Sequence, residues 1–412
     1  MNAPVQTAFS TVDAIRNEVI AAANLPLKRA ITLPRHAYID EDYFRFECET
    51  VLKAGWICIA HVSQLKEAGN FLALDLLGDP LVVVRDKSGA VRVLSRVCAH
   101  RAMDLMPEGF GFARAGSANV FTCPYHHWIY NLDGSLRGCP QMQGAEEFDK
   151  KDWRLTAFRC EVWHGFVFVN PNGKASPLAE QYADFGRAIA PWHTDEMEVV
   201  IAMEWDCEFN WKVMIENWME SYHHLGAHSA TLNPMMPGEN TWTEPEHSYF
   251  VHAHLPFTDA HKGDLSNPCK PRSGFTAIEG LSEAEQSEWG LYLGYPCFMF
   301  LTMPDRVLWY RLQPVAAGRC KLVTSTLIPH ENLSRPGLAE TIAAETKLLR
   351  DFHMEDMMVN TAVQRGLGSG TAVRGRLSHL EEPVWLIQRY LAARAKIAMA
   401  ERGLSTHERD SM

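Results

Sequence analysis

Residues 210–228 read Asn-Trp-Lys-Val-Met-Ile-Glu-Asn-Trp-Met-Glu-Ser-Tyr-His-His-Leu-Gly-Ala-His. This stretch is predicted to begin as a helix around which the rest of the chain is organised. Its apolar members recur at helical spacing and form one stripe, which comprises Trp211, Ile215, Trp218, Tyr222 and Leu225. Glu216, Glu220 and His223 fall together on the opposite side of this helix. Gly226 is predicted to end it, because glycine is favoured just past a helix C-terminus.

His223 and His228 are candidate metal ligands. On a regular helix this spacing puts them roughly 140° apart, so they converge on one point only if the helix ends between them, as the break at Gly226 allows. Two imidazoles at a helix end, with a carboxylate one turn earlier, could hold a divalent metal. The simpler alternative is a solvated polar helix face, and this stretch alone does not decide between the two.

The composition limits what the chain can be. With 412 residues it is too long for one ordinary core, so two domains are predicted. A content of 47% hydrophobic and 22% charged residues is ordinary for a soluble globular protein. The formal net charge of -11 argues against nucleic acid as the main partner and is compatible with a cytoplasmic enzyme.

The chain is expected to be neither a membrane protein nor a disulfide-rich protein. The sequence has no run of about 18 apolar residues. Its start has no basic region followed by an apolar core, so no signal peptide is predicted. Ten cysteines in a chain of this length do not indicate a disulfide scaffold, so most should be reduced and a few could bind metal.

Hydrophobic periodicity divides the chain into three parts. Helices are predicted at residues 12–23, 40–55, 337–365 and 383–400. Short apolar runs alternate with turn signals over 56–169, which is typical of an all-β domain. Later strands are predicted at 199–208, 291–303, 306–314 and 319–329, and the long irregular segment 229–290 is predicted to be a functional loop or lid. The predicted parts are 1–45, 46–170 and 171–412.

Two cysteines and two histidines lie in paired motifs inside the all-β part. The motifs are Cys98-Ala-His100 and, after 22 residues, Cys123-Pro-Tyr-His126. Zinc is the simpler alternative, because Cys₂His₂ is also a zinc set. Small zinc modules, however, pair Cys with Cys and His with His, whereas each loop here supplies one of each. A [2Fe–2S] cluster with both cysteines on one iron and both histidines on the other needs this arrangement, so the motifs favour the cluster.

At these residues the sequence resembles the Rieske non-haem iron oxygenases in their large (α) subunit, and the resemblance covers nearly the whole chain. It implies that the cluster is bound by Cys98, His100, Cys123 and His126. It also implies that Trp128 packs over the cluster. Two positions depart from the family pattern, because Ala102 and His127 stand where glycine is usual. Neither departure removes a ligand.

The Rieske proteins of respiratory complexes are the competing branch. Each of their loops carries a further cysteine, and the two cysteines join as a disulfide. The corresponding positions here are Met103 and Tyr125. The resemblance is therefore to the oxygenase branch and not to a membrane electron-transfer subunit.

The resemblance further implies a mononuclear Fe(II) held by two histidines and one carboxylate, which leaves coordination positions open for O₂. His223 and His228 match the two histidines. The third ligand is predicted to be Asp356, which lies in the middle of an apolar stripe, where a carboxylate is costly unless paired or metal-bound. That stripe comprises Leu338, Ile342, Leu349, Phe352, Val359 and Val363. Other acids on or near the stripe stay open as alternatives, namely Glu345, Asp351 and Glu355.

Three further residues are assigned roles at this site. In the family, an acid at the position of Glu220 bridges the mononuclear site to a Rieske histidine of the neighbouring subunit, within a trimer that brings the two centres together. The alternative for Glu220 is a hydrogen bond that orients His223, and the two roles can coexist. Asn217 and Tyr222 are predicted to line the pocket or to support the ligands, and His224 is predicted to be a surface or core histidine.

The fold implied by the resemblance is α+β. An all-β Rieske [2Fe–2S] domain is expected over 46–170. A helix-grip catalytic domain, with an antiparallel sheet around a long helix, is expected over 171–412. The N-terminal helical segment 1–45 is expected to pack on the catalytic domain.

The predicted function is a cytoplasmic terminal oxygenase that hydroxylates a small organic substrate with O₂. The sequence has no nicotinamide or flavin fingerprint, so electrons are expected from a separate NAD(P)H-dependent reductase, with or without a ferredoxin. The assembly is expected to be a homotrimer or a multiple of one. A pure Rieske electron carrier is the non-enzyme alternative, but it leaves Glu220, His223, His228 and Asp356 unexplained.

Substrate class is less constrained. An aromatic acid or a related ring is the first expectation, with aromatic hydrocarbon catabolism as its setting. A quaternary ammonium compound, which would lose a methyl group or undergo C–N cleavage, is the alternative, because cation–π contacts could hold it. Arg306 or Arg311 could pair with a substrate carboxylate. Candidate pocket aromatics are Trp242, Tyr249, Phe250, Phe298, Phe300, Trp309 and Tyr310.

Overall fold

The computed structural model describes residues 12–260 and 274–409, with side chains described as far as residue 400. These residues form two compact units. The first unit contains the chain up to Leu52, Met203–Thr324, and the chain from Pro336 onward, and the second contains Lys53–Ala202 and Ser325–Arg335. The predicted α+β class is confirmed, with antiparallel sheets throughout and the long helices in the first unit.

Short antiparallel strands dominate the second unit. Its seven-stranded sheet has the order β1-β10-β9-β4-β3-β2-β5. The bounds are β1 Ile57–His61, β2 Asn70–Leu76, β3 Asp79–Arg85, β4 Val91–Ser95, β5 Ala115–Ser117, β9 Ala157–Trp163 and β10 Phe166–Asn170. A three-stranded sheet contains β6 Phe121–Thr122, β7 Ile129–Tyr130 and β8 Leu136–Gly138. Every residue of β1 and β10 is buried, as expected for apolar runs covered on both faces. Short helices α4 Leu178–Gln181 and α5 Ala183–Ile189 follow.

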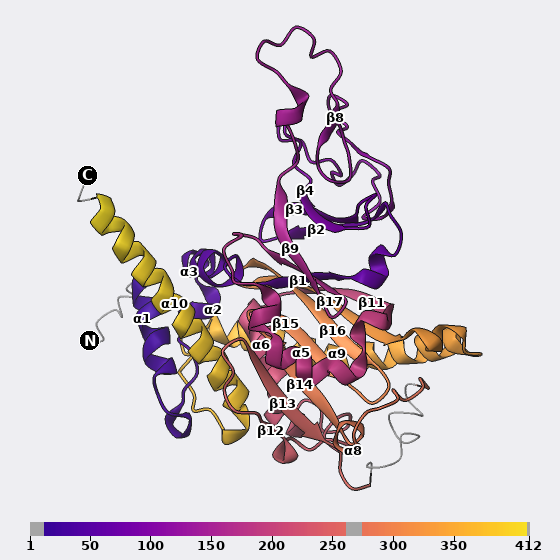
Figure 1. Cartoon of the computed structure of the whole chain (residues 1–412). Helices are drawn as coiled ribbons and strands as arrows, with labels where there is room; N and C mark the ends of the chain where they lie inside the picture. The colour runs from indigo at the N-terminus through magenta and orange to yellow at the C-terminus, as the bar shows by residue number, and fades with distance from the viewer. Residues whose placement is uncertain (1–11, 261–273, 410–412) are drawn as a thin grey trace. The chain divides into compact units, whose positions relative to one another are not determined.

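A second seven-stranded sheet has the order β11-β17-β16-β15-β14-β13-β12, and the first unit contains all of its strands except the start of β11 and the end of β17. The bounds are β11 Met197–Cys207, β12 Trp242–Thr243, β13 Phe250–Pro256, β14 Glu288–Gly294, β15 Phe298–Thr302, β16 Val307–Ala316 and β17 Arg319–Pro329. The helices are α1 Val12–Ala23, α2 His36–Ile39, α3 Glu41–Glu47, α6 Trp211–Met219, α8 Glu283–Gln286, α9 Leu338–Leu367 and α10 Glu382–Arg409. Helices α1 and α10, from opposite ends of the chain, pack side by side (Figure 1).

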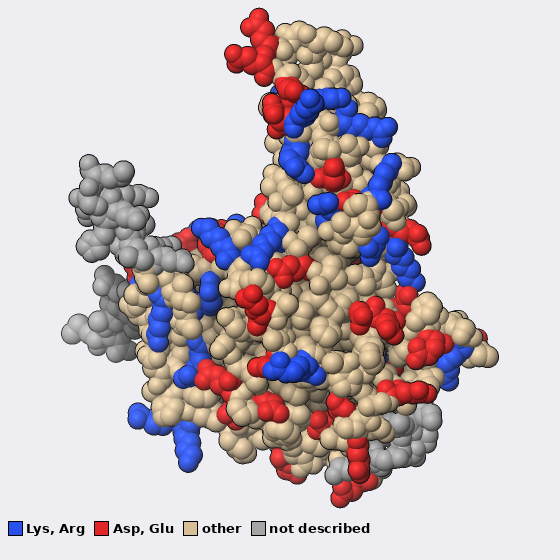
Figure 2. Space-filling view, in the orientation of Figure 1, with Lys and Arg blue, Asp and Glu red and all other residues tan. Residues whose placement is uncertain are grey.

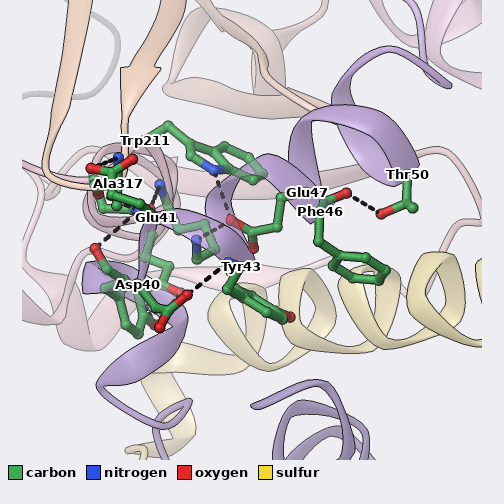
Figure 3. Close-up of polar contacts among 12 residues, drawn as sticks. Asp40, Glu41, Tyr43, Phe46, Glu47, Thr50, Trp211 and Ala317 are labelled. Carbon is green, nitrogen blue, oxygen red and sulfur yellow. Dashed lines mark hydrogen bonds and ion pairs between the residues drawn. The ribbon is translucent and has the colours of Figure 1, made fainter. Parts of the chain in front are cut away.

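Helix α6 lies at the centre of the first unit, because it contacts α9, α10, β14 and β16. A buried ion pair joins it to α3, with the Lys212 ammonium 2.6 Å from the Glu47 carboxylate. The Trp211 indole N–H donates to the same carboxylate at 3.3 Å (Figure 3). Each end of this pair neutralises the other, so both charges can remain in a site closed to water.

The end of α6 differs from the sequence prediction. The helix stops at Met219 rather than at Gly226, and Glu220 is extended, with φ -116° and ψ 144°. A short 3₁₀ turn follows over Tyr222–Leu225. Tyr222 and Leu225 are therefore off the predicted stripe and are exposed.

Glu216 is a second difference. It was predicted on a polar face with Glu220 and His223, but it is mostly buried and accepts a hydrogen bond from the Tyr38 hydroxyl at 2.7 Å. Helix α6 contacts α9, α10, β14 and β16, and each of its residues is buried or only partly exposed. Helical periodicity reports which residues share a face and does not report what covers that face.

Two segments have a different strand structure from the one predicted. The segment 229–290 contains β13 and the start of β14, so it is not irregular throughout; residues 261–273 of it lie outside the described part. The predicted strand 291–303 is two strands, β14 and β15, joined by a tight turn at Tyr295–Cys297.

The buried line of α9 runs through Glu345, Leu349, His353, Met357 and Asn360. Val363, predicted to be apolar core, is 44% exposed. Three of the five buried residues are polar, which is why hydrophobicity alone misplaced the helix's inner face.

Acidic and basic side chains are interspersed over the face shown in Figure 2. None of the helices in the described part of the chain combines the length and the apolar character needed to cross a bilayer.

Candidate metal centres

The two loops of the second unit that carry the predicted cluster ligands have the same backbone arrangement. In each loop, the cysteine N–H donates to the carbonyl five residues later, with Cys98 bonded to Met103 and Cys123 to Trp128, both at 2.8 Å. The amide four residues after each cysteine donates back to the cysteine carbonyl, at 3.0 and 3.1 Å. Both loops therefore curl tightly enough to present a cysteine and a histidine to the same side.

The turn in each loop requires a left-handed residue, and that residue is one of the two departures from the family pattern. Ala102 has φ 55° and His127 has φ 62°. Glycine takes this conformation at no steric cost, whereas a residue with a Cβ is strained in it. The structure thus gives the physical reason why glycine is usual at these two positions.

The four predicted cluster residues come together. Cys98 and Cys123 are 2% and 1% exposed, and the Tyr130 hydroxyl lies 3.1 Å from the Cys98 sulfur. The rings of His100 and His126 lie 4.6 Å apart, and the Trp128 ring stacks on His100 at 4.8 Å.

The donor atoms fit a [2Fe–2S] cluster. The Nδ1 atoms of His100 and His126 are buried and have no hydrogen-bond partner among the described residues. A buried imidazole nitrogen without a partner is costly, and coordination to an iron ion would remove that cost. Two buried thiols and two such nitrogens match a cluster with cysteines on one iron and histidines on the other.

In the first unit, the structure brings together the three residues predicted to hold the mononuclear iron. One ligand atom each from His223, His228 and Asp356 lies within 4.8 Å of the others. The Asp356 carboxylate is 3.0 Å from His228 Nε2 and 3.6 Å from His223 Nε2. The early end of α6 and the following 3₁₀ turn bring His223 toward α9, which carries Asp356.

The charges at this cluster favour a cation. Burial raises the pKa of Asp356, but the hydrogen bond and charge of His228 outweigh it and hold this pKa below its ordinary value. Burial lowers the pKa of His228, but Asp356 and Glu355 outweigh it and raise this pKa. A carboxylate with two imidazoles on one side of a cavity is the donor set of a non-haem iron(II) site.

A second carboxylate orients each of the two histidines. Glu220 accepts from His223 Nδ1 at 2.7 Å, and its other oxygen accepts the His223 backbone N–H at 3.0 Å. Glu355 lies 2.6 Å from His228 Nδ1 and accepts a hydrogen bond from the Thr231 hydroxyl at 2.8 Å. These contacts leave both Nε2 atoms facing Asp356 and fix the ring orientations.

Glu355 was considered in the sequence only as another possible ligand. Its orienting role could not be read from spacing, because its partner His228 lies 127 residues earlier. The sequence feature that could have indicated this role is the pair of adjacent acids, Glu355 and Asp356, on a helix predicted to face the core. Glu345, the other acid on the stripe, pairs instead with Arg306 at 2.8 Å.

A small cavity of about 60 Å³ adjoins the His223–His228–Asp356 cluster. Its walls include the four aromatic side chains Trp218, Trp289, Tyr310 and Phe352, together with several leucines. Asn217 lines it and accepts a hydrogen bond from Asn360 at 3.2 Å. Tyr222 does not line it, because α6 ends early and the Tyr222 side chain is 49% exposed.

Of the aromatic residues predicted to line a pocket, Tyr310 is on this wall. Trp242 and Tyr249 are instead a little less than half exposed and do not line this cavity. Arg306 is buried and paired with Asp305 and Glu345, so its charge is already balanced. His224 is buried, with Nδ1 2.9 Å from the Met236 carbonyl, and burial lowers its pKa to about 4. It is a core histidine, one of the two roles predicted for it.

Two family models match the chain. One, for the Rieske [2Fe–2S] domain, matches residues 55–149, and the other, for the catalytic domain of the ring hydroxylating alpha subunit, matches residues 194–396. The all-β unit has the paired Cys–His loops of a Rieske domain. The other unit has the His₂–carboxylate cluster of a ring-hydroxylating catalytic domain. Together they define an iron protein with two metal centres.

Similar proteins agree with these matches. The carnitine monooxygenase oxygenase subunit of Acinetobacter pittii is 32% identical over 201 residues, which are 48% of this chain and 53% of that protein. The chloroplastic choline monooxygenase of Arabidopsis thaliana is 27% identical over 376 residues, 87% of this chain and 82% of that protein. A solved quaternary ammonium Rieske monooxygenase, 25% identical, has a TM-score of 0.76 over 91% of this chain and 97% of that one.

The chain belongs to the Rieske non-haem iron oxygenase family, as an α subunit. Members of this family bind a [2Fe–2S] cluster in the Rieske domain and an iron ion in the catalytic domain, so the two predicted cofactors are confirmed as those of the family. The match to the carnitine protein of Acinetobacter pittii spans about half of that relative's length.

Proposed function

We propose that this protein is the terminal oxygenase of a Rieske non-haem iron system, acting on a quaternary ammonium compound. The observation that carries the oxygenase assignment is the presence, on one chain, of both donor sets. The Cys₂His₂ loops account for a one-electron centre, and the His₂–carboxylate cluster with its adjoining cavity accounts for a site where O₂ and substrate meet.

In this proposal each set of residues has a defined task. Cys98, Cys123, His100 and His126 hold the cluster. His223, His228 and Asp356 hold Fe(II), with Glu220 and Glu355 fixing the two rings. When bound, the two iron centres supply single electrons and open coordination positions for O₂. The apolar cavity wall keeps water away from the reacting face of the substrate.

The substrate assignment rests on the cavity wall and on the relatives. Four aromatic side chains line the cavity beside the iron ligands. Aromatic faces attract a quaternary ammonium group, which has no hydrogen to donate, through their negative π surfaces. The relatives named above act on carnitine and choline, both of which carry such a group. The first expectation, an aromatic acid in aromatic hydrocarbon catabolism, has no such support.

Glu220 is proposed to have a second task besides orienting His223. In the assembly we propose, a homotrimer or a multiple of one, Glu220 connects His223 to a Rieske histidine of a neighbouring copy. The support is its position directly on His223 Nδ1 and the inter-subunit electron transfer described for the solved quaternary ammonium enzyme. A separate NAD(P)H-dependent reductase, alone or with a ferredoxin, completes the proposed system, which we place in the cytoplasm.

Iron content tests the oxygenase assignment. We expect anaerobically purified protein to contain about three iron atoms and about two acid-labile sulfides per chain. His223→Ala should lower the iron to about two atoms per chain with the cluster spectrum intact. If the purified protein holds two irons and takes up no third on incubation with Fe(II), the chain is an electron carrier and the oxygenase assignment fails.

A matched substrate pair tests the substrate class. Carnitine, choline and glycine betaine should be compared with benzoate, using a generic ferredoxin–reductase pair and O₂ consumption coupled to product. For whichever quaternary compound is turned over, its neutral tert-butyl analogue should have a KM about tenfold higher, because it lacks the cation–π attraction. If benzoate is turned over and none of the quaternary ammonium compounds is, the substrate class is an aromatic acid instead.

A further inference from the structure

A second group of metal-ligating side chains lies in the first unit, away from the iron cluster. It consists of Glu244, which follows β12, and of His252 and His254 on β13. One potential ligand atom from each lies within 4.8 Å of the other two. Strands β12 and β13 form one edge of the seven-stranded sheet (Figure 1).

Strand geometry explains how these side chains meet. His252 and His254 are two apart on β13, so both side chains point to the same face of the sheet. The Glu244 backbone N–H donates to the His252 carbonyl at 2.9 Å, which holds the carboxylate beside the pair. Leu255, next along β13, lines the iron cavity and therefore points to the other face. The group is separate from the iron site.

The contacts around His254 match those of a metal-binding histidine. Its Nδ1 lies 2.6 Å from the Glu288 carboxylate, while its Nε2 lies 3.4 Å from the Glu244 carboxylate. A carboxylate on the far nitrogen of an imidazole fixes the tautomer and leaves the near nitrogen free to coordinate. The indole of Trp242 stacks on the His254 ring at 3.7 Å and restricts its rotation.

His252 supplies an independent indication of a missing ligand. The residue is 9% exposed, and its Nε2 is buried without a hydrogen-bond partner among the described residues. Its ring is fixed between neighbours, 4.0 Å from Tyr292 and 4.0 Å from His254. The Nε2 of His254 is likewise buried without a hydrogen bond in the described part of the chain. Two buried imidazole nitrogens without hydrogen bonds, on side chains that converge with one carboxylate, are costly unless a cation lies between them.

We propose that Glu244, His252 and His254 bind a divalent metal of the zinc class. Two imidazole nitrogens and one carboxylate oxygen are borderline ligands that suit Zn²⁺, and a water molecule completes the tetrahedron. The negative charge of Glu244, with that of Glu288 behind His254, balances the ion. The role is structural, because the ion fastens the segment after β12 to β13 at an edge of the sheet, where backbone pairing is short.

The experiment uses the full chain with its cluster and with the mononuclear site disabled by His223→Ala. This protein is dialysed against a chelator, equilibrated with zinc chloride and desalted, and zinc is counted by mass spectrometry. We expect about one zinc ion per chain. Adding Glu244→Gln or His254→Gln should lower the zinc by about tenfold or more, in line with the loss of a ligand. The matched control is His247→Gln, a nearby histidine outside the group, which should retain the zinc.

Two further measurements distinguish loss of the zinc site from misfolding of the chain. The cluster absorption spectrum must be unchanged in every variant that is counted. Zinc should raise the melting temperature of the His223→Ala protein and of the His247→Gln control, but not that of the Glu244→Gln variant. Zinc-edge absorption should show two imidazole ligands. The proposal is overturned if the His223→Ala protein retains no zinc, or if Glu244→Gln and His254→Gln retain as much as the control.

Discussion

At the scale of single residues, Ala102 and His127 are two of the seven non-glycine residues with positive φ in the second unit, and both lie in the loops that carry the predicted cluster ligands. Both have positive φ, and both are exposed, so their side chains contribute little packing. Replacing either with glycine removes a steric cost of roughly 1–2 kcal/mol, partly offset by the greater freedom of glycine in the unfolded chain.

We therefore expect Ala102→Gly and His127→Gly each to stabilise the cluster-loaded chain by up to about 1 kcal/mol. The measurement is the melting temperature, followed through loss of the cluster spectrum. Ala99→Gly is the matched control, because it lies in the same loop without a positive φ and should destabilise. If Ala102→Gly and Ala99→Gly lower the melting temperature equally, the strain argument is wrong.

The role of Glu355 can be seen only from its contact with His228 in the folded chain. Its carboxylate lies on His228 Nδ1 at 2.6 Å, so Glu355→Gln removes the charge that fixes the His228 ring and its tautomer. We expect the affinity for the mononuclear iron to fall about 10- to 100-fold, with the cluster unaffected. Iron retained after dialysis against graded chelator measures this. Glu340→Gln, at an exposed acid on the same helix, should behave like the parent protein.

At the scale of elements, α6 carries ionisable side chains that are buried against neighbouring elements. Besides the Lys212–Glu47 pair, α6 contributes Glu216, whose carboxylate is held by the Tyr38 hydroxyl at 2.7 Å. Burial raises the pKa of Glu216 to about 7, and the Tyr38 hydrogen bond only partly opposes this. The folded state therefore holds a proton on Glu216 at a pH where the unfolded chain has lost it.

The sign of the pH dependence follows from that difference. The stabilising contribution of protonated Glu216 is complete below its unfolded pKa of about 4.5 and is lost as pH rises through about 7. We expect Glu216→Gln, which keeps an acceptor for Tyr38, to raise stability at pH 8 by roughly 2–3 kcal/mol relative to the parent and to change it little at pH 4. Thermal unfolding at several pH values measures this, with exposed Glu208→Gln as the control. Equal pH profiles for parent and Glu216→Gln would refute it.

At the scale of the whole molecule, the two donor sets lie in separate compact units, and each is completed by residues of its own unit. The two sites should therefore load independently. We expect Cys123→Ser to abolish the cluster spectrum while the chain still retains about one iron at the His223–His228–Asp356 site. Metal analysis with the visible spectrum gives both numbers. Substrate oxidation should be lost in Cys123→Ser and in His223→Ala alike.

Residue spacing and periodicity were enough to locate the two Cys–His motifs and the long helices. Cysteines and histidines that serve one loop are close in sequence, so Cys98–His100 and Cys123–His126 could be paired from spacing alone. Helix α1 and the predicted helix at 337–365 were placed correctly, to within about two residues, because their apolar periodicity is sustained. The α+β class, by contrast, was implied by the resemblance to the family and not by periodicity.

Contacts between residues far apart in the chain are seen only in the fold. It brought Asp356 and Glu355 to His228 across more than a hundred residues, ended α6 at Met219, and buried Glu216 under neighbouring elements. It likewise placed Glu244 beside a histidine pair that looked like part of an irregular loop. The physical reason is that periodicity and spacing report only local geometry. Burial, pairing and coordination depend on which surfaces of remote segments cover one another, and packing of the whole chain sets that.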